Sequence, residues 1–523
     1  MIIPSDILEK YNNTRFNTDK SIVCHAPTVK LNFEQNGTVR ACCYNTVHIL
    51  GNWPAQSIKE IWTGDKITEL REYIAKNDLG DGCSICGKML ESGNYQGAKS
   101  RYYDEFLPNR IHNRAMRYIS SLQNNFIYPK VMEFELSNTC NLECVMCNGY
   151  FSSSIRKNRE HLPPMVSPYD DRFVDQLEEF IPHLTDAKFL GGEPFMIDIY
   201  IKIWERIRKI NPGVRIHITT NGTFLNERIK ELLEGLKVGI IVSIDTIVPD
   251  TYKSIRVNGN LSKVLENVEY FRQYTRRKRT FMSIAACPMT NNWREIPQLM
   301  DFCLQRGIAM FLNIVYYPRE LSFEDKSPEY LDEMVRFLSD HPAPPTKSAG
   351  ESAHNLTVRA YNGFARMVEG WHKESIVREK NARIARLIEE RFTKEYDPTR
   401  EISWSLDEIR KYIDLMGQME MTGYIEQDVA FQKYLSELFV LTPEGKVLEL
   451  IKCYLEWYDM KHSGILLQTL TPKLAFMAEA VESHPHRSHI LAEISKTSPV
   501  QFAMDMEKRD EGQMLLDMRK HFG

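Results

Sequence analysis

The sequence predicts an α/β protein, with an incomplete (β/α)6 barrel between a cysteine-rich N-terminal module and a mainly helical C-terminal region. Six short apolar runs alternate with amphipathic stretches between residues 131 and 318. Five of the 11 cysteines fall within the first hundred residues, and strand-like runs largely stop beyond residue 318. Because 523 residues exceed one ordinary domain, we expect two or three domains.

Each apolar run is short enough for one buried strand, and the runs are separated by helical stretches. This alternation predicts a parallel sheet with right-handed crossovers, and six units rather than eight predict an open barrel of the TIM type. The predicted strands are Val131–Leu136, Ala187–Leu190, Arg215–Thr219, Val238–Ile244, Thr280–Ala286 and Met310–Tyr316. The predicted helices are Asp171–Ile181, Ile197–Ile210, Asn226–Leu236, Leu261–Arg277, Pro297–Arg306 and Ser327–Asp340.

We place the cysteine-rich module at residues 1–90, a linker at 91–130, the barrel at 131–318 and the helical region at 319–523. The helical region also carries turn residues for a short hairpin at Leu438–Leu450 and a histidine group at residues 484, 486 and 489. Proline breaks the helical spacing of that group, so we do not expect it to bind metal. An open barrel needs closing, and we expect the helical region to cap the substrate.

Composition excludes some classes of function. The chain is 43% hydrophobic and 26% charged, which is typical of globular protein, and its net charge of −4 does not favour nucleic acid or an anionic membrane. The N-terminal residues lack the apolar core of a secretion signal, and no stretch is long enough to span a membrane. We therefore expect a cytoplasmic protein, in which clustered thiols bind metal rather than form disulfides.

A three-cysteine loop follows the first barrel strand directly. Cys140, Cys144 and Cys147 have the CxxxCxxC spacing. Three thiolates can hold three irons of a cubane cluster, which leaves the fourth iron open to a substrate. The alternative is a structural zinc site, but such a site usually pairs CxxC knuckles, and no fourth ligand lies close in sequence.

This loop, at the end of a first barrel strand, resembles that of the radical S-adenosylmethionine (SAM) superfamily. The resemblance implies that Cys140, Cys144 and Cys147 hold a 4Fe–4S cluster whose open iron binds SAM. Reductive cleavage would give a 5′-deoxyadenosyl radical that takes a hydrogen atom from the substrate, with flavodoxin or a ferredoxin-type protein as electron donor. Met146 occupies a position that is often aromatic in this family and touches the adenine, where a thioether can still pack on the ring.

The ends of the next strands resemble the SAM-binding motifs of the same family. Gly191-Gly192-Glu193-Pro194 resembles the GGEP motif, which implies that Glu193 accepts a hydrogen bond from the SAM ammonium. Arg256 resembles the arginine that pairs with the SAM carboxylate, and a guanidinium suits that role. Without the resemblance, these residues would be turn, strand-end and surface residues. The polar residues that would face the SAM ribose and carboxylate are Asn221, Ser243 and Asp245.

The N-terminal module supplies four further thiols. An Asn-Gly turn at residues 36 and 37 would bring Cys24 and Cys42 together, and Cys83 and Cys86 form a CxxC pair. Four thiolates fit zinc or a cubane cluster. The arrangement resembles the twitch module, the short relative of the SPASM module of radical SAM enzymes, although it precedes the barrel here. The resemblance implies an auxiliary 4Fe–4S cluster, with Cys43 pointing elsewhere.

The function that we expect is hydrogen-atom abstraction from a small molecule, leading to dehydrogenation, epimerisation or rearrangement. Modification of a ribosomally made peptide or a protein side chain is the alternative. A nucleotide or base substrate and a cluster protein without chemistry are less favoured. Cys287, which ends the fifth predicted strand, is a candidate hydrogen-atom donor to a substrate radical, although free cysteines are usually small apolar packing residues.

Overall fold

The computed structural model describes residues 2–15, 20, 22–45, 47–80, 82–95, 97–106, 128–347 and 352–395. It comprises one unit of Met1–Phe323 with Phe337–Ala365, and a second unit of Glu324–Arg336 with Arg366–Gly523. The hairpin expected at Leu438–Leu450 and the histidine group lie outside the described residues. The capping role of residues 319–523 remains a prediction.

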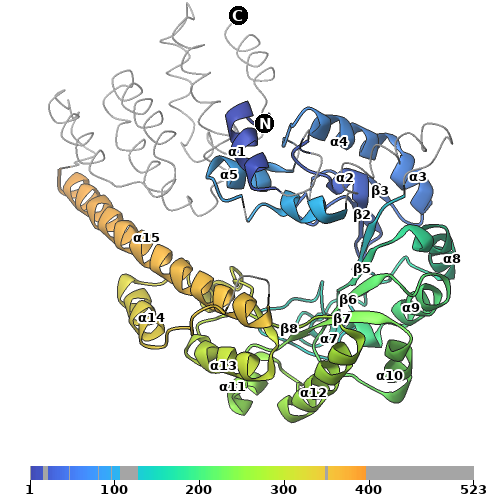
Figure 1. The fold of residues 1–523 in the computed structure, drawn as a ribbon. Helices are drawn as coiled ribbons and strands as arrows, with labels where there is room; N and C mark the ends of the chain where they lie inside the picture. Colours follow the sequence, from blue (N-terminus) through green and yellow to red (C-terminus); the bar gives the residue numbers. More distant parts are fainter. Residues whose placement is uncertain are drawn as a thin grey trace, which may run out of the picture. The chain divides into compact units, whose positions relative to one another are not determined.

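The first unit is organised around one nine-stranded sheet with the order β3-β2-β1-β4-β5-β6-β7-β8-β9 (Figure 1). From β4 to β9 every neighbouring pair is parallel, and the strands follow their order in the chain. The two edges of the described sheet are different strands, so the barrel is open. These strands confirm the six predicted ones: β4 (Val131–Phe134), β5 (Asp186–Phe189), β6 (Arg215–Thr220), β7 (Lys237–Ser243), β8 (Met282–Ala286) and β9 (Ala309–Leu312).

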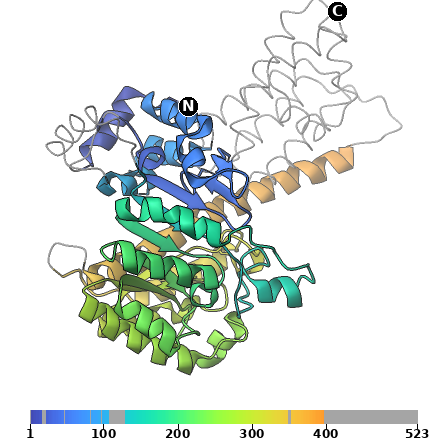
Figure 2. The ribbon, with the colours of Figure 1, turned by 90° about the vertical axis from the view of Figure 1, so that its right-hand side faces the viewer.

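Helices connect these strands, and several of them begin at side chains that cap the first turn. Asp170, Asn226 and Asn260 each accept a hydrogen bond from the backbone N–H three residues later, which fixes the starts of α8, α10 and α12. These helices and α9 lie along one face of the strands (Figures 1 and 2). The elements are α7 (Ser153–Asn158), α8 (Asp171–Phe180), η2 (Ile181–His183), η3 (Pro194–Met196), α9 (Asp198–Ile210), α10 (Glu227–Glu234), α11 (Pro249–Ile255), α12 (Leu261–Lys278), η4 (Trp293–Glu295) and α13 (Ile296–Arg306).

Alternate residues of each strand face these helices. Phe134 of β4 packs edge-on against Phe173 of α8, and Phe189 of β5 packs against Trp204 of α9. The strand residues that alternate with these helix-facing residues point to the opposite side of the sheet, which we call the inner face. Along β6 the helix-facing residues are buried, whereas the inner-face residue His217 is partly exposed. One row of the inner face is Asn32, Glu133, Lys188 and His217, which lie in direct register.

The N-terminal module continues the barrel sheet. Its first strand, β1, pairs in parallel with β4, so that Lys30 lies beside Val131. The predicted turn is present between β1 and β2, and Gly37 has a φ of +90°, which favours glycine. The elements are α1 (Ser5–Asn13), α2 (Ala26–Val29), β1 (Lys30–Phe33), β2 (Thr38–Arg40), β3 (Gly51–Asn52), α3 (Ile58–Thr63), α4 (Asp65–Ala75), α5 (Ser84–Glu91) and η1 (Lys99–Phe106).

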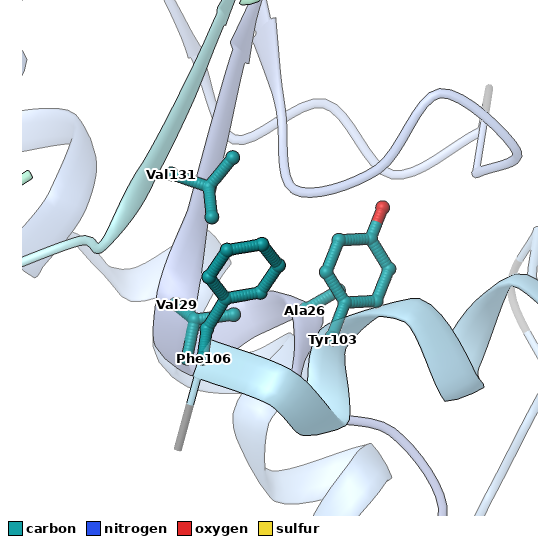
Figure 3. Close-up of a cluster of buried hydrophobic side chains, with 5 residues drawn as sticks. All are labelled: Ala26, Val29, Tyr103, Phe106 and Val131. Atoms are coloured by element: carbon teal, nitrogen blue, oxygen red, sulfur yellow. The ribbon is translucent and has the colours of Figure 1, made fainter. Parts of the chain in front are cut away.

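A small hydrophobic cluster joins the module to the barrel. Tyr103 and Phe106 of η1 pack with Ala26 and Val29 of the module against Val131 of β4 (Figure 3). Helix η1 lies within the segment 91–130, which we expected to be a linker. Part of that segment is therefore ordered structure that packs on the start of the barrel.

Three further elements complete the described chain: η5 (Arg319–Leu321), α14 (Pro328–Asp340) and α15 (Ala353–Glu395). Within the second unit, the guanidinium of Arg378 donates hydrogen bonds to the carbonyls of Glu324 and Lys326. Cys303 is buried on α13, which agrees with a packing role. None of the described helices combines the length and apolar character needed to cross a membrane.

Candidate functional site

The three-cysteine loop begins six residues after the last residue of β4 and is tied to two other elements. The backbone N–H of Cys140 donates to the Ser153 hydroxyl, and the Ser154 hydroxyl donates to the Cys140 carbonyl. On its other side the loop pairs with the end of α11, where Val145 N donates to the Ile255 carbonyl over 2.9 Å. These bonds fix the backbone that carries the three thiols.

The thiols of the loop are partly buried, with N–H donors close to two of them. Asn221 Nδ2 is 3.8 Å from Cys140 Sγ, and Arg256 Nη1 is 3.7 Å from Cys144 Sγ. Burial is the largest cause that raises the pKa of all three thiols, and the pKa of Cys147 reaches about 11 because Cys144 and Cys140 also lie near it. Thiolates in such a place need positive charge, which cluster irons supply.

The four residues of the Gly-Gly-Glu-Pro turn pack against the loop. Gly191 and Gly192 have φ values of +76° and +50°, and a Cβ on Gly192 would lie 2.2 Å from the Thr139 carbonyl oxygen. The close approach that requires glycine is therefore made to the backbone just before Cys140. An additional approach of these glycines to SAM remains a prediction.

The Glu193 side chain is fully buried and is held by the end of β6. Its Oε1 accepts from the Thr220 hydroxyl over 2.7 Å and from Phe195 N over 3.2 Å, and its Oε2 accepts from Asn221 N over 2.7 Å. Burial raises its pKa to about 7. Pro194 opens η3 directly after it. The carboxyl thus joins the ends of β5 and β6, and the expected contact with the SAM ammonium remains a prediction.

Arg256 lies between a buried carboxylate and a cluster cysteine. Its Nε is 2.8 Å from Asp245 Oδ2, and both side chains are buried. Although burial opposes its charge, Asp245 and Cys144 raise the pKa of Arg256. Asp245 Oδ1 also accepts from Cys287 N over 2.8 Å. The structure thereby brings together Arg256, Asp245, Cys144 and Cys287, which the sequence singled out in separate segments.

Met146 and Cys287 share one hydrophobic cluster, in which both pack against Ile255, Met289 and Val315. The Cys287 thiol is partly exposed, and burial raises its pKa to about 12. It therefore keeps its S–H bond at neutral pH, as a hydrogen-atom donor must. Ser243 ends β7 in register with Ala285, on the inner face of the sheet.

The four module thiols line one pocket. Its lining includes Cys24, Cys42, Cys83 and Cys86, together with Ser100 and Tyr103 of η1. The charges of Cys42, Cys86 and Cys83 all act on Cys24, which confirms that the four sulfurs lie near one another. Cys43 is exposed and is not among the lining residues.

Every thiol of this pocket accepts a hydrogen bond from the chain. The donors to Cys24, Cys42 and Cys83 are Ala26 N at 3.5 Å, the Tyr103 hydroxyl at 3.2 Å and Asn45 Nδ2 at 3.3 Å. The backbone N–H of Ser100 donates to Cys86. Donors to sulfur stabilise thiolate ligands and tune a bound cluster, so the pocket suits a thiolate-ligated iron–sulfur group.

An iron–sulfur cluster does not require the four thiols to surround one metal position. No three His, Cys, Asp or Glu side chains in the described part of the chain are arranged to hold a single metal ion. A cubane cluster does not require that arrangement, because each thiolate binds a separate iron.

Several residues of these sites were not predicted from sequence. Tyr103 and Asn45 contact cluster thiols, and Lys30 forms a buried ion pair with Glu133 in which Nζ and Oε2 are 2.7 Å apart. Charged residues inside buried strand segments, such as Lys30 and Glu133, were a usable signal, because an isolated buried charge is costly. No local pattern marks Tyr103 or Asn45.

Comparison with known families agrees with this geometry. Residues 134–303 match the model of the radical SAM superfamily, and residues 24–87 match SPASM, an iron–sulfur cluster-binding domain. The chain therefore carries a radical SAM domain and, before it in the sequence, a SPASM-type module. Its radical SAM domain implies a 4Fe–4S cluster and SAM, and its SPASM domain implies an auxiliary iron–sulfur cluster.

Similar proteins cover only part of the chain. A GTP 3',8-cyclase of Limosilactobacillus fermentum is 30% identical over 145 residues, which is 26% of this chain and 40% of the relative. A probable GTP 3',8-cyclase of Methanococcus maripaludis is 30% identical over 190 residues, 36% of this chain and 59% of the relative. The chain thus spans about half the length of these relatives. SuiB of Streptococcus suis bound to SAM is a solved structure with 16% identity and a TM-score of 0.31, covering 51% of this chain and 61% of SuiB.

Proposed function

We propose that the chain reductively cleaves SAM and abstracts a hydrogen atom from a small-molecule substrate bound at the inner face. The net reaction would be of the oxidoreductase or isomerase type. The observation that carries the proposal is the contact of Arg256 with both Cys144 Sγ and Asp245, which follow the carboxyl ends of β4 and β7. Active sites of parallel barrels lie at this edge.

The cluster and SAM, when bound, supply the electron transfer and the adenosyl radical. The residues of the chain hold and shield them. Cys140, Cys144 and Cys147 would bind the cluster, and Arg256 would pair with the SAM carboxylate while Asp245 holds its guanidinium. Met146 would pack on the adenine.

Other side chains of the site would act on the substrate or on SAM. Cys287 faces the same hydrophobic cluster as Met146 and would donate its hydrogen atom where the product requires one. Glu193, Asn221 and Ser243 would orient polar groups of SAM, with Gly191, Gly192 and Pro194 shaping the turn beside them.

A small-molecule substrate is favoured by two observations. The inner face is partly exposed along β6, at His217 and Thr219, so part of it is accessible to a small ligand. The relatives named GTP 3',8-cyclase also act on a small molecule, according to their names. A peptide substrate would require a longer groove. We further propose a cytoplasmic location, which keeps the thiols reduced, and a flavodoxin or ferredoxin-type electron donor.

The test is 5′-deoxyadenosine formation by the anaerobically reconstituted protein with SAM and a strong reductant. The wild type should form it, and Cys140→Ala should not. Cys303→Ala is the matched control, because Cys303 is a buried packing residue outside both sites. Formation of 5′-deoxyadenosine by the Cys140→Ala protein would refute the proposal. The low-mass fraction of a cell extract, rather than its peptide fraction, should increase 5′-deoxyadenosine formation. This result would indicate a small-molecule substrate.

A further inference from the structure

The inner face carries one carboxylate that the chain leaves uncompensated. Glu135 follows β4 directly and lies two residues beyond Glu133, on the same side of the sheet. It is partly exposed. Among the described residues, no hydrogen bond or ion pair is formed by its carboxylate. A substrate could therefore reach this group.

The carboxylates nearest to Glu135 are already paired. Glu133 is bound by Lys30 at 2.7 Å, and Glu34 is bound by Arg40 at 2.6 Å. Burial, followed by the charges of Glu133 and Glu34, raises the pKa of Glu135 to about 7. Lys30 also acts on Glu135 but offsets only part of this effect, so the pKa of Glu135 stays raised.

A second acceptor without a donor lies on the neighbouring strand. Asn32 is only 3% exposed, and its Oδ1 has no hydrogen-bond partner among the residues that the structure describes. It is in register with Glu133, so its side chain shares the inner face with Glu135. Buried acceptors are normally satisfied. Two unsatisfied acceptors on adjacent strands point to a ligand that brings several N–H donors.

Glu135 lies close to the residues that we propose bind the cluster and SAM. A Cβ added to Gly191 would be 3.4 Å from Glu135 Cα, so Glu135 contacts the Gly-Gly-Glu-Pro turn. Tyr150, three residues beyond Cys147, lies within electrostatic range of Glu135. On the opposite side, Lys30 lies near Cys42 of the auxiliary pocket. Glu135 thus occupies the inner face between the two sets of cysteines.

We propose that the substrate carries a cationic nitrogen group, a primary ammonium or a guanidinium, which binds Glu135 and is also recognised by Asn32. This inference rests on the proposed use of the inner face as the substrate site. It disfavours a nucleoside triphosphate at this position, because phosphates would meet carboxylates. A free amine and a lysine or arginine side chain would offer the same chemistry.

The experiment compares three unbranched five-carbon probes by isothermal titration calorimetry with the reconstituted protein, without reductant: cadaverine, pentanediol and glutarate. Cadaverine should bind saturably, and pentanediol and glutarate should not. Glu135→Gln should weaken cadaverine binding at least roughly tenfold, as expected for one lost charged hydrogen bond. Glu135→Asp, which keeps the charge, should lose less.

The control variant is Glu227→Gln, which removes an exposed carboxylate of α10 and should bind as the wild type does. Iron content and circular dichroism verify that each variant is folded. The inference is overturned if cadaverine does not bind, if glutarate binds more tightly, or if Glu135→Gln binds equally well. SAM cleavage plays no part in this measurement. If cadaverine does not bind, the substrate inference fails, and the proposed function is still tested separately by 5′-deoxyadenosine formation.

Discussion

The guanidinium of Arg256 lies 3.7 Å from Cys144 Sγ through Nη1 and 2.8 Å from Asp245 Oδ2 through Nε. One side chain thus connects a cluster ligand with the end of β7. Because the guanidinium is planar and has several donors, it can keep these contacts and still present an N–H group to a carboxylate. A lysine ammonium cannot replace all of them.

Arg256→Lys should therefore weaken SAM binding roughly tenfold, since at least one charged hydrogen bond is lost while the positive charge stays. Equilibrium binding of SAM to the reconstituted protein measures this, and the EPR spectrum of the reduced cluster should also shift. Arg272→Lys, at a partly exposed arginine paired with Glu269, serves as control. Unchanged SAM affinity and an unchanged spectrum would show that Arg256 has only a structural role.

The pocket lined by the four module thiols leads to a separate prediction about the iron content of the protein. Two cubane clusters give about eight irons per chain after reconstitution. Cys86→Ala should lower this to about four and leave SAM cleavage without substrate largely intact, since the three-cysteine loop is untouched. Cys43→Ala should retain about eight irons, because Cys43 lies outside the pocket lining. A wild-type protein with about four irons and one bound zinc would contradict the auxiliary cluster.

Sequence spacing sufficed for the six barrel strands, because these depend on short-range periodicity. It also singled out the four thiols that line one pocket, while the ligand roles of both cysteine sets stay predictions. It did not reveal that β1 pairs with β4, since Lys30 and Val131 are brought together by packing of segments about 100 residues apart. The burial of Glu193 was missed for the same reason. Its partners Thr220 and Asn221 belong to another strand, and the motif alone suggests an exposed ligand contact.

Gly192→Ala should disrupt the three-cysteine loop. Its φ of +50° is unfavourable for alanine, and the new Cβ would lie 2.2 Å from the Thr139 carbonyl oxygen. We expect the free energy of unfolding to fall by about 1–3 kcal/mol and cluster iron to be lost from the loop. Chemical denaturation and iron analysis measure both. Gly93→Ala is the matched control: φ is also positive there, but a Cβ meets no atom within 4 Å, so the loop cluster should stay loaded.

Lys188 gives a pH dependence of stability. It lies on the inner face with its ammonium 3.9 Å from the centroid of the Tyr102 ring, and burial lowers its pKa from 10.5 to about 8. Between these two values the unfolded chain binds more protons than the folded chain, so this residue makes stability rise with pH over that window. The full effect on the free energy of unfolding is about 3 kcal/mol.

Lys188→Met should remove the rise, as measured by the difference in unfolding free energy between variant and wild type at pH values from about 8 to 10.5. Lys263→Met, at an exposed lysine of α12, should leave the pH profile unchanged. The prediction is wrong if the difference in unfolding free energy between wild type and Lys188→Met does not change with pH over this window. The Lys188 ammonium would then be solvated, and the inner face would be more open than its burial indicates.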